Sequence, residues 1–310
     1  AITPGTTYAA VTANMVTDMF SIPLTAIAST SAQAAATFVA DTTAPVVNSF
    51  ALNMNSGTLT LSFSEPVDTN TLQVVELTLQ PSASTNDAST KVTLSGASSS
   101  SSSNGLVVVV SIGTSDLNDM KKIRTLAHGT SSSYLVLTAD AIKDMSGVKV
   151  VAISNGSGKQ ALSYTTDSTS PQVVSFNLNI DTGRITLSFS ETIDATTLST
   201  SAVVVQNAAT AGGSSTYVQL SGGVASSTLT DSATIDLSFD DLNAVKVRLT
   251  PAKAAGSSYL VVSSALVKDM FGNAVVAIVD GSAIVVSQYT PDTTAPTLEA
   301  YDVFMTGAVL

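Results

Sequence analysis

Apolar and polar residues alternate with a period of two in short runs along most of the chain. The first two clear runs span Val46 to Met54 and Gly57 to Asp68, and the turn-forming residues Asn55-Ser56-Gly57 separate them. Such alternation is typical of strands that bury one face. The short turn between them predicts an antiparallel hairpin.

Further short runs follow this hairpin, and each is bounded by Gly, Ser, Asn or Asp. They are Leu72 to Gln80, Thr90 to Ser95, Leu106 to Ile112, Ser133 to Ala139, Val148 to Ser154 and Gln160 to Thr166. Runs in the same order recur after residue 170, from VVSFNLNI and RITLSFSE to AIVVSQY. The run Thr114 to Lys122 and its counterpart Phe239 to Lys246 are compatible with a helix instead. We expect each to form a single helical turn between sheets.

A linker motif divides the chain into repeats. DTTAP at Asp41 to Pro45 returns as DSTSP at Asp167 to Pro171 and as DTTAP at Asp292 to Pro296, with starts 167−41 = 126 and 292−167 = 125 residues apart. A Tyr followed ten residues later by Asp-Met forms a second landmark, at Tyr8/Asp18/Met19, Tyr134/Asp144/Met145 and Tyr259/Asp269/Met270. Repetition at this period predicts tandem domains.

The landmarks predict four segments. Residues 1–40 correspond to the C-terminal strands of a unit, 41–166 and 167–291 to two whole units, and 292–310 to the first strand or strands of a further unit. Seven or eight short strands per unit, without alternating helices, predict an all-β fold of tandem immunoglobulin-like (Ig-like) antiparallel β-sandwiches with partial units at both termini.

Three motifs carry a family resemblance. LSFSEPVD (Leu61 to Asp68), LSFSETID (Leu187 to Asp194) and ALVKDMFGN (Ala265 to Asn273), with a late Tyr-Leu-Val, resemble the bacterial-type Ig-like repeats of S-layer and large surface proteins. The resemblance implies a spacer, lattice or fibre module outside the cell, and in some such repeats calcium at the junctions. Unit one departs from the pattern, because KDMSGV lacks the Asn that follows Gly in ALVKDMFGN.

Composition narrows the classes of partner. The net charge is −11 and the twelve Lys and Arg residues are scattered, so nucleic acid and anionic membrane surfaces are poor partners and cations are better ones. No apolar run approaches the ~20 residues that a membrane-spanning helix needs. The N-terminal AITPGTTYAA lacks the basic start and apolar centre of a signal peptide and reads as domain sequence. The chain has no Cys, which leaves the redox compartment open.

Six acidic residues are the candidate site. If the first strand starts at one pole of a sandwich, the second strand and the sixth strand end at that same pole, the sixth strand of unit one being Ser133 to Ala139. The carboxylates should therefore converge in two groups of three: Asp41, Glu65 and Asp144 in unit one, and Asp167, Glu191 and Asp269 in unit two. Each group could hold Ca²⁺. Alternatively, each acid caps a turn by accepting backbone N–H groups.

Nothing in the sequence predicts an enzyme. His128 is the only histidine and lies in a segment of unit one without a counterpart in unit two, so a Ser/His/Asp triad would depend on one unrepeated residue. The repeated aromatic residues are expected in the core rather than on a ligand platform. They are Phe50, Phe63, Phe176, Phe189, Tyr134 and Tyr259.

Two segments are candidate glycosylation sites. Asn155-Gly156-Ser157 is the single N-glycosylation sequon. A serine run in a low-complexity loop could carry O-glycans or serve as a flexible linker. Its residues are Ser98, Ser99, Ser100, Ser101, Ser102 and Ser103.

These observations favour a structural protein of a filament or surface array. In one hypothesis, copies of the chain assemble head to tail into an open polymer by strand complementation. In the other, the chain is a window of a longer array of the same units. An adhesive binding module is a further alternative, but its loops should be rich in aromatic or charged residues, and the loops here are rich in Ser, Gly, Ala and Asn.

Overall fold

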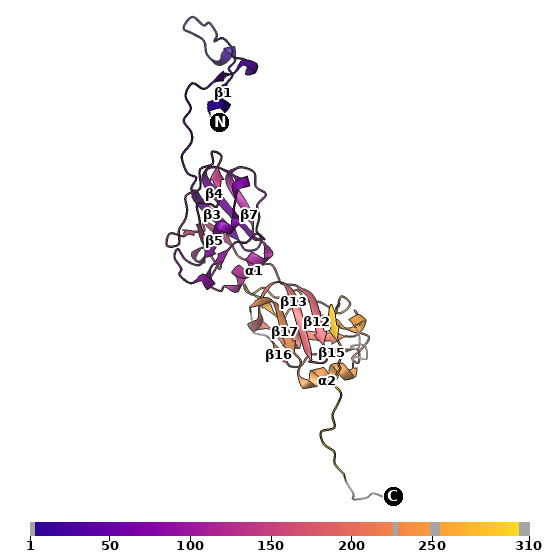
Figure 1. Ribbon diagram of the computed structural model, residues 1–310. Helices are drawn as coiled ribbons and strands as arrows, with labels where there is room; N and C mark the ends of the chain where they lie inside the picture. Colours follow the sequence, from indigo (N-terminus) through magenta and orange to yellow (C-terminus); the bar gives the residue numbers. More distant parts are fainter. Residues whose placement is uncertain (1–3, 226–228, 249–254, 304–310) are drawn as a thin grey trace. The chain divides into compact units, whose positions relative to one another are not determined.

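The computed structural model describes residues 4–225, 229–248 and 255–303. The chain divides between Thr166 and Asp167 into two compact parts (Figure 1). Below, unit one denotes residues 41–166 of the first part and unit two denotes residues 167–291 of the second, apart from the N-terminal and C-terminal segments. Both are mostly β-structure in several largely antiparallel sheets, which confirms the predicted fold class.

Unit one contains two sheets. The first has the order β11-β3-β4-β7, with β9 paired to the end of β4, and the second has the order β10-β8-β5-β6. The strands are β3 (Val47–Asn53), β4 (Thr58–Asp68), β5 (Leu77–Gln80), β6 (Val92–Thr93), β7 (Gly105–Ser111), β8 (Tyr134–Leu137), β9 (Lys143–Asp144), β10 (Lys159–Gln160) and β11 (Ser163–Thr165).

Unit two repeats this arrangement. Its sheets have the orders β16-β17-β13-β12-β21, with β19 paired to β13, and β15-β14-β18-β20. The strands are β12 (Val173–Asn179), β13 (Arg184–Asp194), β14 (Val203–Gln206), β15 (Tyr217–Gln219), β16 (Val224–Ala225), β17 (Thr230–Asp236), β18 (Tyr259–Val262), β19 (Lys268–Asp269), β20 (Ile284–Val285) and β21 (Gln288–Thr290).

The predicted hairpin of Val46 to Met54 with Gly57 to Asp68 is present as β3 and β4, which pair from Asn53–Thr58 to Val47–Phe63. Gly57 closes its turn with a φ of 62°, a conformation that glycine adopts without steric cost. β11 pairs with β3 in parallel, and β21 with β12 likewise, which the sequence pattern does not reveal. The run Val148 to Ser154 forms only isolated bridges to Lys143 and Leu137.

The core of each unit lies between its two sheets. In unit two, Phe176 and Leu187 of one sheet and Val205 and Leu260 of the other belong to a single cluster of buried residues. Phe50 and Phe176, which are equivalent, are each 1% exposed. Phe63 and Phe189 are also buried, whereas Tyr134 and Tyr259 are only half-buried.

The two helices are longer than predicted. α1 (Thr114–Lys122) has nine residues and α2 (Phe239–Arg248) has ten, well beyond the single turn expected of each. Buried carboxylates in their first turns fix them to the loops that follow β6 and β15. Asp116 accepts hydrogen bonds from Ser95 N–H (2.9 Å) and Ser98 Oγ (2.6 Å), and Asp241 accepts from Ser221 N–H (3.0 Å). The first-turn acids also suit the positive end of the helix dipole.

Short 3₁₀ helices connect the strands. They are Pro4–Thr6, Ala13–Met15, Ser29–Ser31, Thr69–Thr71, Val74–Glu76, Ala88–Thr90, Thr130–Ser132, Ala195–Thr197, Thr200–Ala202 and Ala255–Ser257. One of them replaces the start of the strand predicted over Leu72 to Gln80.

The serine run covers the outer edge of β7. Ser99 exchanges backbone hydrogen bonds with Ser111 (3.0 and 2.7 Å), Ser100 Oγ donates to Val109 O (2.7 Å), and Val109 N–H donates to Ser102 Oγ (2.8 Å). In unit two, β16 pairs with β17 at the equivalent place. A partner along this edge leaves fewer free N–H and C=O groups to bind another strand.

The N-terminal segment forms a hairpin of its own. β1 (Tyr8–Ala9) pairs with β2 (Gln33–Ala34), and isolated bridges join Val11 to Ile27 and Thr17 to Pro23. Residues 35–40, the last part of the segment expected to hold the C-terminal strands of a unit, form no strand. Residues 292–303 contain no strand either, and the rest of the C-terminal strand prediction falls on 304–310, outside the described residues.

Replacing either buried phenylalanine should destabilise its own unit. We expect Phe50→Ala to lower the free energy of unfolding of unit one, and Phe176→Ala that of unit two, by about 3–5 kcal/mol, because each leaves a cavity between the sheets. Amide hydrogen exchange of β3–β4 and β12–β13 measures the two units separately. Leu162→Ala, at a side chain that is 75% exposed, is the control. Equal loss of protection in both units would contradict independent cores.

Asp116→Asn should destabilise unit one in a pH-dependent way. Burial alone would raise the pKa of Asp116, but the hydrogen bonds from Ser98 and Ser95 outweigh it and hold this pKa below its ordinary value. The stabilisation is thus fully present above the unfolded-state pKa of about 3.9 and is lost as the pH falls through the lower folded-state value.

We expect a loss of about 1.5–3 kcal/mol at pH 7, since charge-assisted hydrogen bonds are removed. The difference from the unchanged protein should shrink below about pH 4. Unfolding of unit one followed by hydrogen exchange at several pH values measures both effects. Asp119→Asn, which removes an exposed pair with Lys122 (2.9 Å), is the matched control and should cost under about 0.5 kcal/mol. A pH-independent loss at Asp116 would contradict this explanation.

Candidate functional site

The structure brings both groups of three carboxylates together. In each group, one oxygen per residue lies within 4.8 Å of the others. The first group joins Asp41, Glu65 and Asp144, and the second joins Asp167, Glu191 and Asp269. The six acids thus lie in the two groups expected from the strand directions.

The strands reach this place differently from the prediction. Glu65 lies inside β4 rather than after it, because β4 continues to Asp68 and pairs there with β9, with Val67 opposite Asp144. The register of β4 shifts between Ser62 and Val67, so Glu65 sits in an irregular stretch. Glu191 has the same position in β13, where Ile193 pairs with Asp269 of β19.

One oxygen of each late aspartate caps a turn. Asp144 Oδ1 accepts hydrogen bonds from the N–H groups of Ser146 (2.8 Å) and Val148 (2.7 Å). Asp269 Oδ1 accepts in the same way from Phe271 and Asn273, both at 2.8 Å. In both late aspartates, Asp144 and Asp269, the oxygen that caps the turn is therefore Oδ1.

The linker aspartates cap their own motif. Asp41 Oδ1 accepts from Thr43 N–H (2.9 Å), Asp167 Oδ1 from Thr169 N–H (3.0 Å), and Asp292 Oδ1 from Thr294 N–H (3.1 Å). This short-range contact explains why Asp recurs at the start of D-x-T-x-P.

The second oxygens differ between the units. Asp144 Oδ2 is buried and has no hydrogen-bond partner, although the residue is only 3% exposed. In unit two, the Asn273 amide donates to Asp269 Oδ2 (2.7 Å) and to the carbonyl oxygen of Asp167 (3.3 Å). Val148 occupies the equivalent place in unit one and has no amide to offer. Asn273, which has no counterpart in KDMSGV of unit one, thus joins the linker of unit two to the turn that follows Asp269.

Mutual repulsion acts on the acids of unit one. Burial raises the pKa of Glu65, and the negative charges of Asp41 and Asp144 raise it further. Three clustered carboxylates offer only oxygen ligands, which suit hard cations.

The sequence pattern missed a second acidic contact at the other end of unit two. Asp181, in the turn between β12 and β13, accepts hydrogen bonds from the N–H groups of Thr293 (2.8 Å) and Thr294 (3.1 Å). These bonds hold the pKa of Asp181 below its ordinary value. Lys246 of α2 pairs with Asp292 at 2.7 Å. The next linker is therefore fixed to unit two where it leaves the domain.

His128 lies on an exposed loop. Its backbone N–H donates to Ser132 Oγ (3.0 Å), and partial desolvation together with the positive charge of Arg124 lowers the pKa of its imidazole. His128 thus contacts residues of its own loop.

The candidate glycosylation residues have structural contacts. Asn155 Nδ2 donates to Thr85 O (2.8 Å), and its Oδ1 accepts from Gln80 Nε2 (3.2 Å) and Thr85 N–H (3.0 Å). Asp280 makes the equivalent contact with Gln206 in unit two (3.0 Å). Ser98 is buried with its hydroxyl on Asp116, while Ser99, Ser101 and Ser103 are exposed. Glycosylation at these positions stays a prediction.

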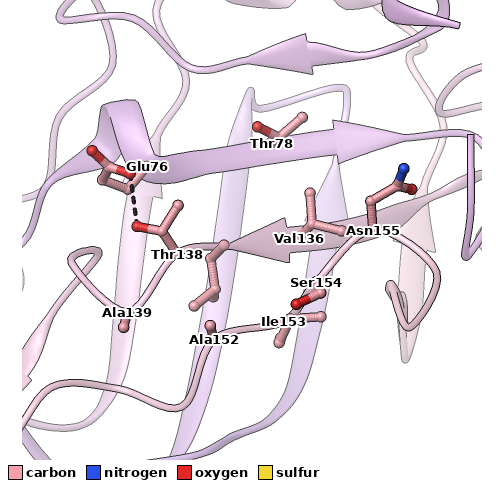
Figure 2. Close-up of a pocket in the computed structure, with 10 residues that line it drawn as sticks. Glu76, Thr78, Val136, Thr138, Ala139, Ala152, Ile153, Ser154 and Asn155 are labelled. Carbon is pink, nitrogen blue, oxygen red and sulfur yellow. Dashed lines mark hydrogen bonds between the residues drawn. The ribbon is translucent and has the colours of Figure 1, made fainter. Parts of the chain in front are cut away.

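A shallow groove beside β8 recurs in equivalent positions. In unit one it is lined by residues of β8 and of the segment 152–155, with Glu76 at one end bonded to Thr138 Oγ1 (2.7 Å; Figure 2). Equivalent residues line grooves in unit two and in the N-terminal segment. Ala202 replaces Glu76 in unit two, so the shared lining is small, apolar or hydroxyl-bearing. The groove follows from the sparse pairing of this segment with β8.

Comparisons with known proteins identify structural similarity alone. No protein-family model matches the sequence, and no curated protein matches it. Among solved structures, the S-layer protein rSbsC(31–844) is similar with 16% identity and a TM-score of 0.27, over 80% of this chain and 26% of that one.

Two further structures of SbsC are similar. The N-terminal part of this bacterial S-layer protein has 13% identity and a TM-score of 0.25, over 63% of this chain and 44% of that one. SbsC domains 1–6 have 14% identity and a TM-score of 0.25, over 80% and 26%. The chain thus spans less than half the length of these structures. The similarity concerns fold. In the described part of the chain, no helix has the length and apolarity needed to cross a membrane.

Asn273→Val should loosen the linker of unit two. The substitution copies the residue of unit one and removes the amide that bonds to Asp269 and to the Asp167 carbonyl. We expect faster amide hydrogen exchange at residues 167–169, with the β12–β13 hairpin unchanged. Asn179→Val, which instead removes a cap of the β12–β13 turn at Thr182 N–H (3.0 Å), is the control and should leave exchange at residues 167–169 unchanged. Unchanged exchange at 167–169 in Asn273→Val would contradict the role given to this side chain.

Proposed function

We propose that the chain is a structural spacer: a run of sandwich units in a tandem array, which carries load and sets distance rather than catalysing a reaction. The principal support is the pairing of the N-terminal segment. Its pairs are Tyr8 with Ala34, Val11 with Ile27 and Thr17 with Pro23. When 126 is added to these residue numbers, the resulting residues are also paired with each other in unit one. When a further 125 is added, the resulting residues are paired in unit two.

The same segment has apolar side chains placed for a core. Val16 is 56% exposed and Leu24 is 38% exposed. Their equivalents in the two units, Ile142 and Val267 for the first and Val150 and Val275 for the second, are each 1% exposed. A spacer unit would cover these side chains with the strands equivalent to β3–β7.

The C-terminal segment shows the complementary pattern. Leu298, Tyr301 and Val303 are 81%, 77% and 65% exposed. Their equivalents in β3 are Val47, Phe50 and Leu52, each 1% exposed. This segment therefore has the inward-facing sequence of a first strand, without the sheet that would bury it.

A strand-complemented filament is the second candidate. The exposed apolar side chains of both segments could be covered by another copy of the chain, in a heterologous contact that gives an open polymer. The two segments together lack equivalents of β5, β6, β7 and all but the first two residues of β4, so a composite unit would remain incomplete. The array supplies these strands from one polypeptide, and for this reason we prefer it.

An extracellular or cell-surface setting belongs to the same proposal. It is the setting implied by the resemblance of LSFSEPVD and ALVKDMFGN to surface repeats. The hydroxyl-rich, charge-poor composition suits a passive module that binds its neighbours weakly.

The mass of the natural polypeptide distinguishes the two candidates. The array predicts an intact mass far above the 31.4 kDa of these residues, measured on protein from its native source after removal of glycans. Antibodies against unit two should label intact cells. A mass near 31.4 kDa, with polymers that dissociate into that species, would favour the filament. A mass near this value in a monomer would contradict both.

A further inference from the structure

We propose that each complete unit binds one divalent cation, Ca²⁺ by ligand chemistry, between its linker aspartate, its β4- or β13-type glutamate and its late aspartate. The ligands are Asp41, Glu65 and Asp144 in unit one, and Asp167, Glu191 and Asp269 in unit two. This inference concerns a site within a unit and does not depend on whether the units form an array.

The distances fit an ion of this size. Oxygens bound to Ca²⁺ lie about 2.3–2.6 Å from it, so two ligands on one ion are at most about 5 Å apart. The three oxygens of each group lie within 4.8 Å of one another. Mg²⁺ requires about 2.0–2.1 Å and near-ideal octahedral geometry, which three carboxylates from separate segments are less suited to provide.

An unsatisfied buried oxygen points independently to a ligand. Asp144 Oδ1 is already used by two backbone N–H groups, whereas Asp144 Oδ2 is shielded from solvent and has no hydrogen-bond partner. A buried carboxylate oxygen in that state costs about 1–3 kcal/mol or more. A cation between Asp144, Asp41 and Glu65 would satisfy it. The turn cap and the metal site therefore use different oxygens of one side chain.

The electrostatics agree with this geometry. The negative charges of Asp41 and Asp144 stand beside Glu65, whose pKa is raised by burial and by these charges. In unit two all three acids are buried, with Asp269 only 2% exposed. A bound cation would replace the repulsion within each group by attraction.

The ligands come from separate parts of the unit. Asp41 and Asp167 belong to the D-x-T-x-P linkers, while Glu65 and Glu191 lie on central strands. An ion held by both would tie the entering linker to the domain body. The linker of unit two has this tie in part through Asn273, and that of unit one lacks the amide. We therefore expect the ion to have the larger effect on the linker of unit one.

Calcium titration of the whole chain tests the inference. After removal of metal with a chelator, calorimetric titration up to about 10 mM Ca²⁺ should show two saturable sites. Glu65→Gln should weaken one site by about 100-fold, Glu191→Gln the other, and the double variant should show neither. Asp87→Asn is the matched control, because Asp87 caps a turn through Ser89 (2.9 Å) outside both groups. It should retain both sites.

Mn²⁺ locates the ion without any substitution. Paramagnetic broadening of amide signals in the unchanged protein should centre on residues 41–43 and 144–148 in unit one, and on 167–169 and 269–273 in unit two. Excess Ca²⁺ should reverse it. This measurement decides the question even if a glutamine variant fails to fold. Absence of saturable binding below about 10 mM Ca²⁺, or broadening centred elsewhere, would overturn the inference and leave the acids as turn caps.

Discussion

The structure depends on one constraint: a sheet with an apolar face is stable only when a second sheet covers that face. Within each unit, Phe50 or Phe176 and their neighbours are buried between two sheets that come from segments far apart in the sequence. The helices and loops pack around these two sheets. Asp116 and Asp241 fix a helix to the loop that follows β6 or β15, and the serine run or β16 covers an edge. The same constraint makes the two terminal segments informative, because they have the inward-facing side chains of a unit without its covering sheet.

The acidic groups add a second, local level of organisation. Each group combines an aspartate of a linker, a glutamate of a central strand and an aspartate that caps the turn after β9 or β19. The three carboxylates are close together only when these three parts of the unit are folded. The hydrogen bonds at Oδ1 shape the turns, and one oxygen of each acid lies within 4.8 Å of one oxygen of each other acid in its group. At the far end of unit two, Asp181 and Lys246 hold the next linker. Unit two thus holds the chain both where it enters and where it leaves the domain.

Much of this could be predicted from the sequence, because it follows from periodicity and from the repeat. The β3–β4 hairpin, the buried Phe positions and the convergence of the six acids needed only alternation and strand direction. Other features depend on tertiary contacts. The helices are longer than a turn, and in each a buried aspartate of the first turn bonds to a loop residue about 20 positions earlier, Asp116 to Ser95 and Asp241 to Ser221. The run Val148 to Ser154 alternates like a strand yet forms only bridges. Ser98 looks like part of a loop, but its hydroxyl binds a buried carboxylate. The parallel pairing of β11 with β3 has no local signal at all.

The central claim is that residues 1–40 form the end of a sandwich unit and need its other strands to be covered. A fusion with a second copy of residues 41–126 placed directly before Ala1 supplies those strands in the natural order. Amide hydrogen exchange should then show protection at Val11, Val16, Leu24 and Ile27 approaching that of their equivalents in unit one, with unit two unchanged. If these amides exchange at the same rate with and without the added strands, the N-terminal segment is not part of a sandwich, and the account is wrong.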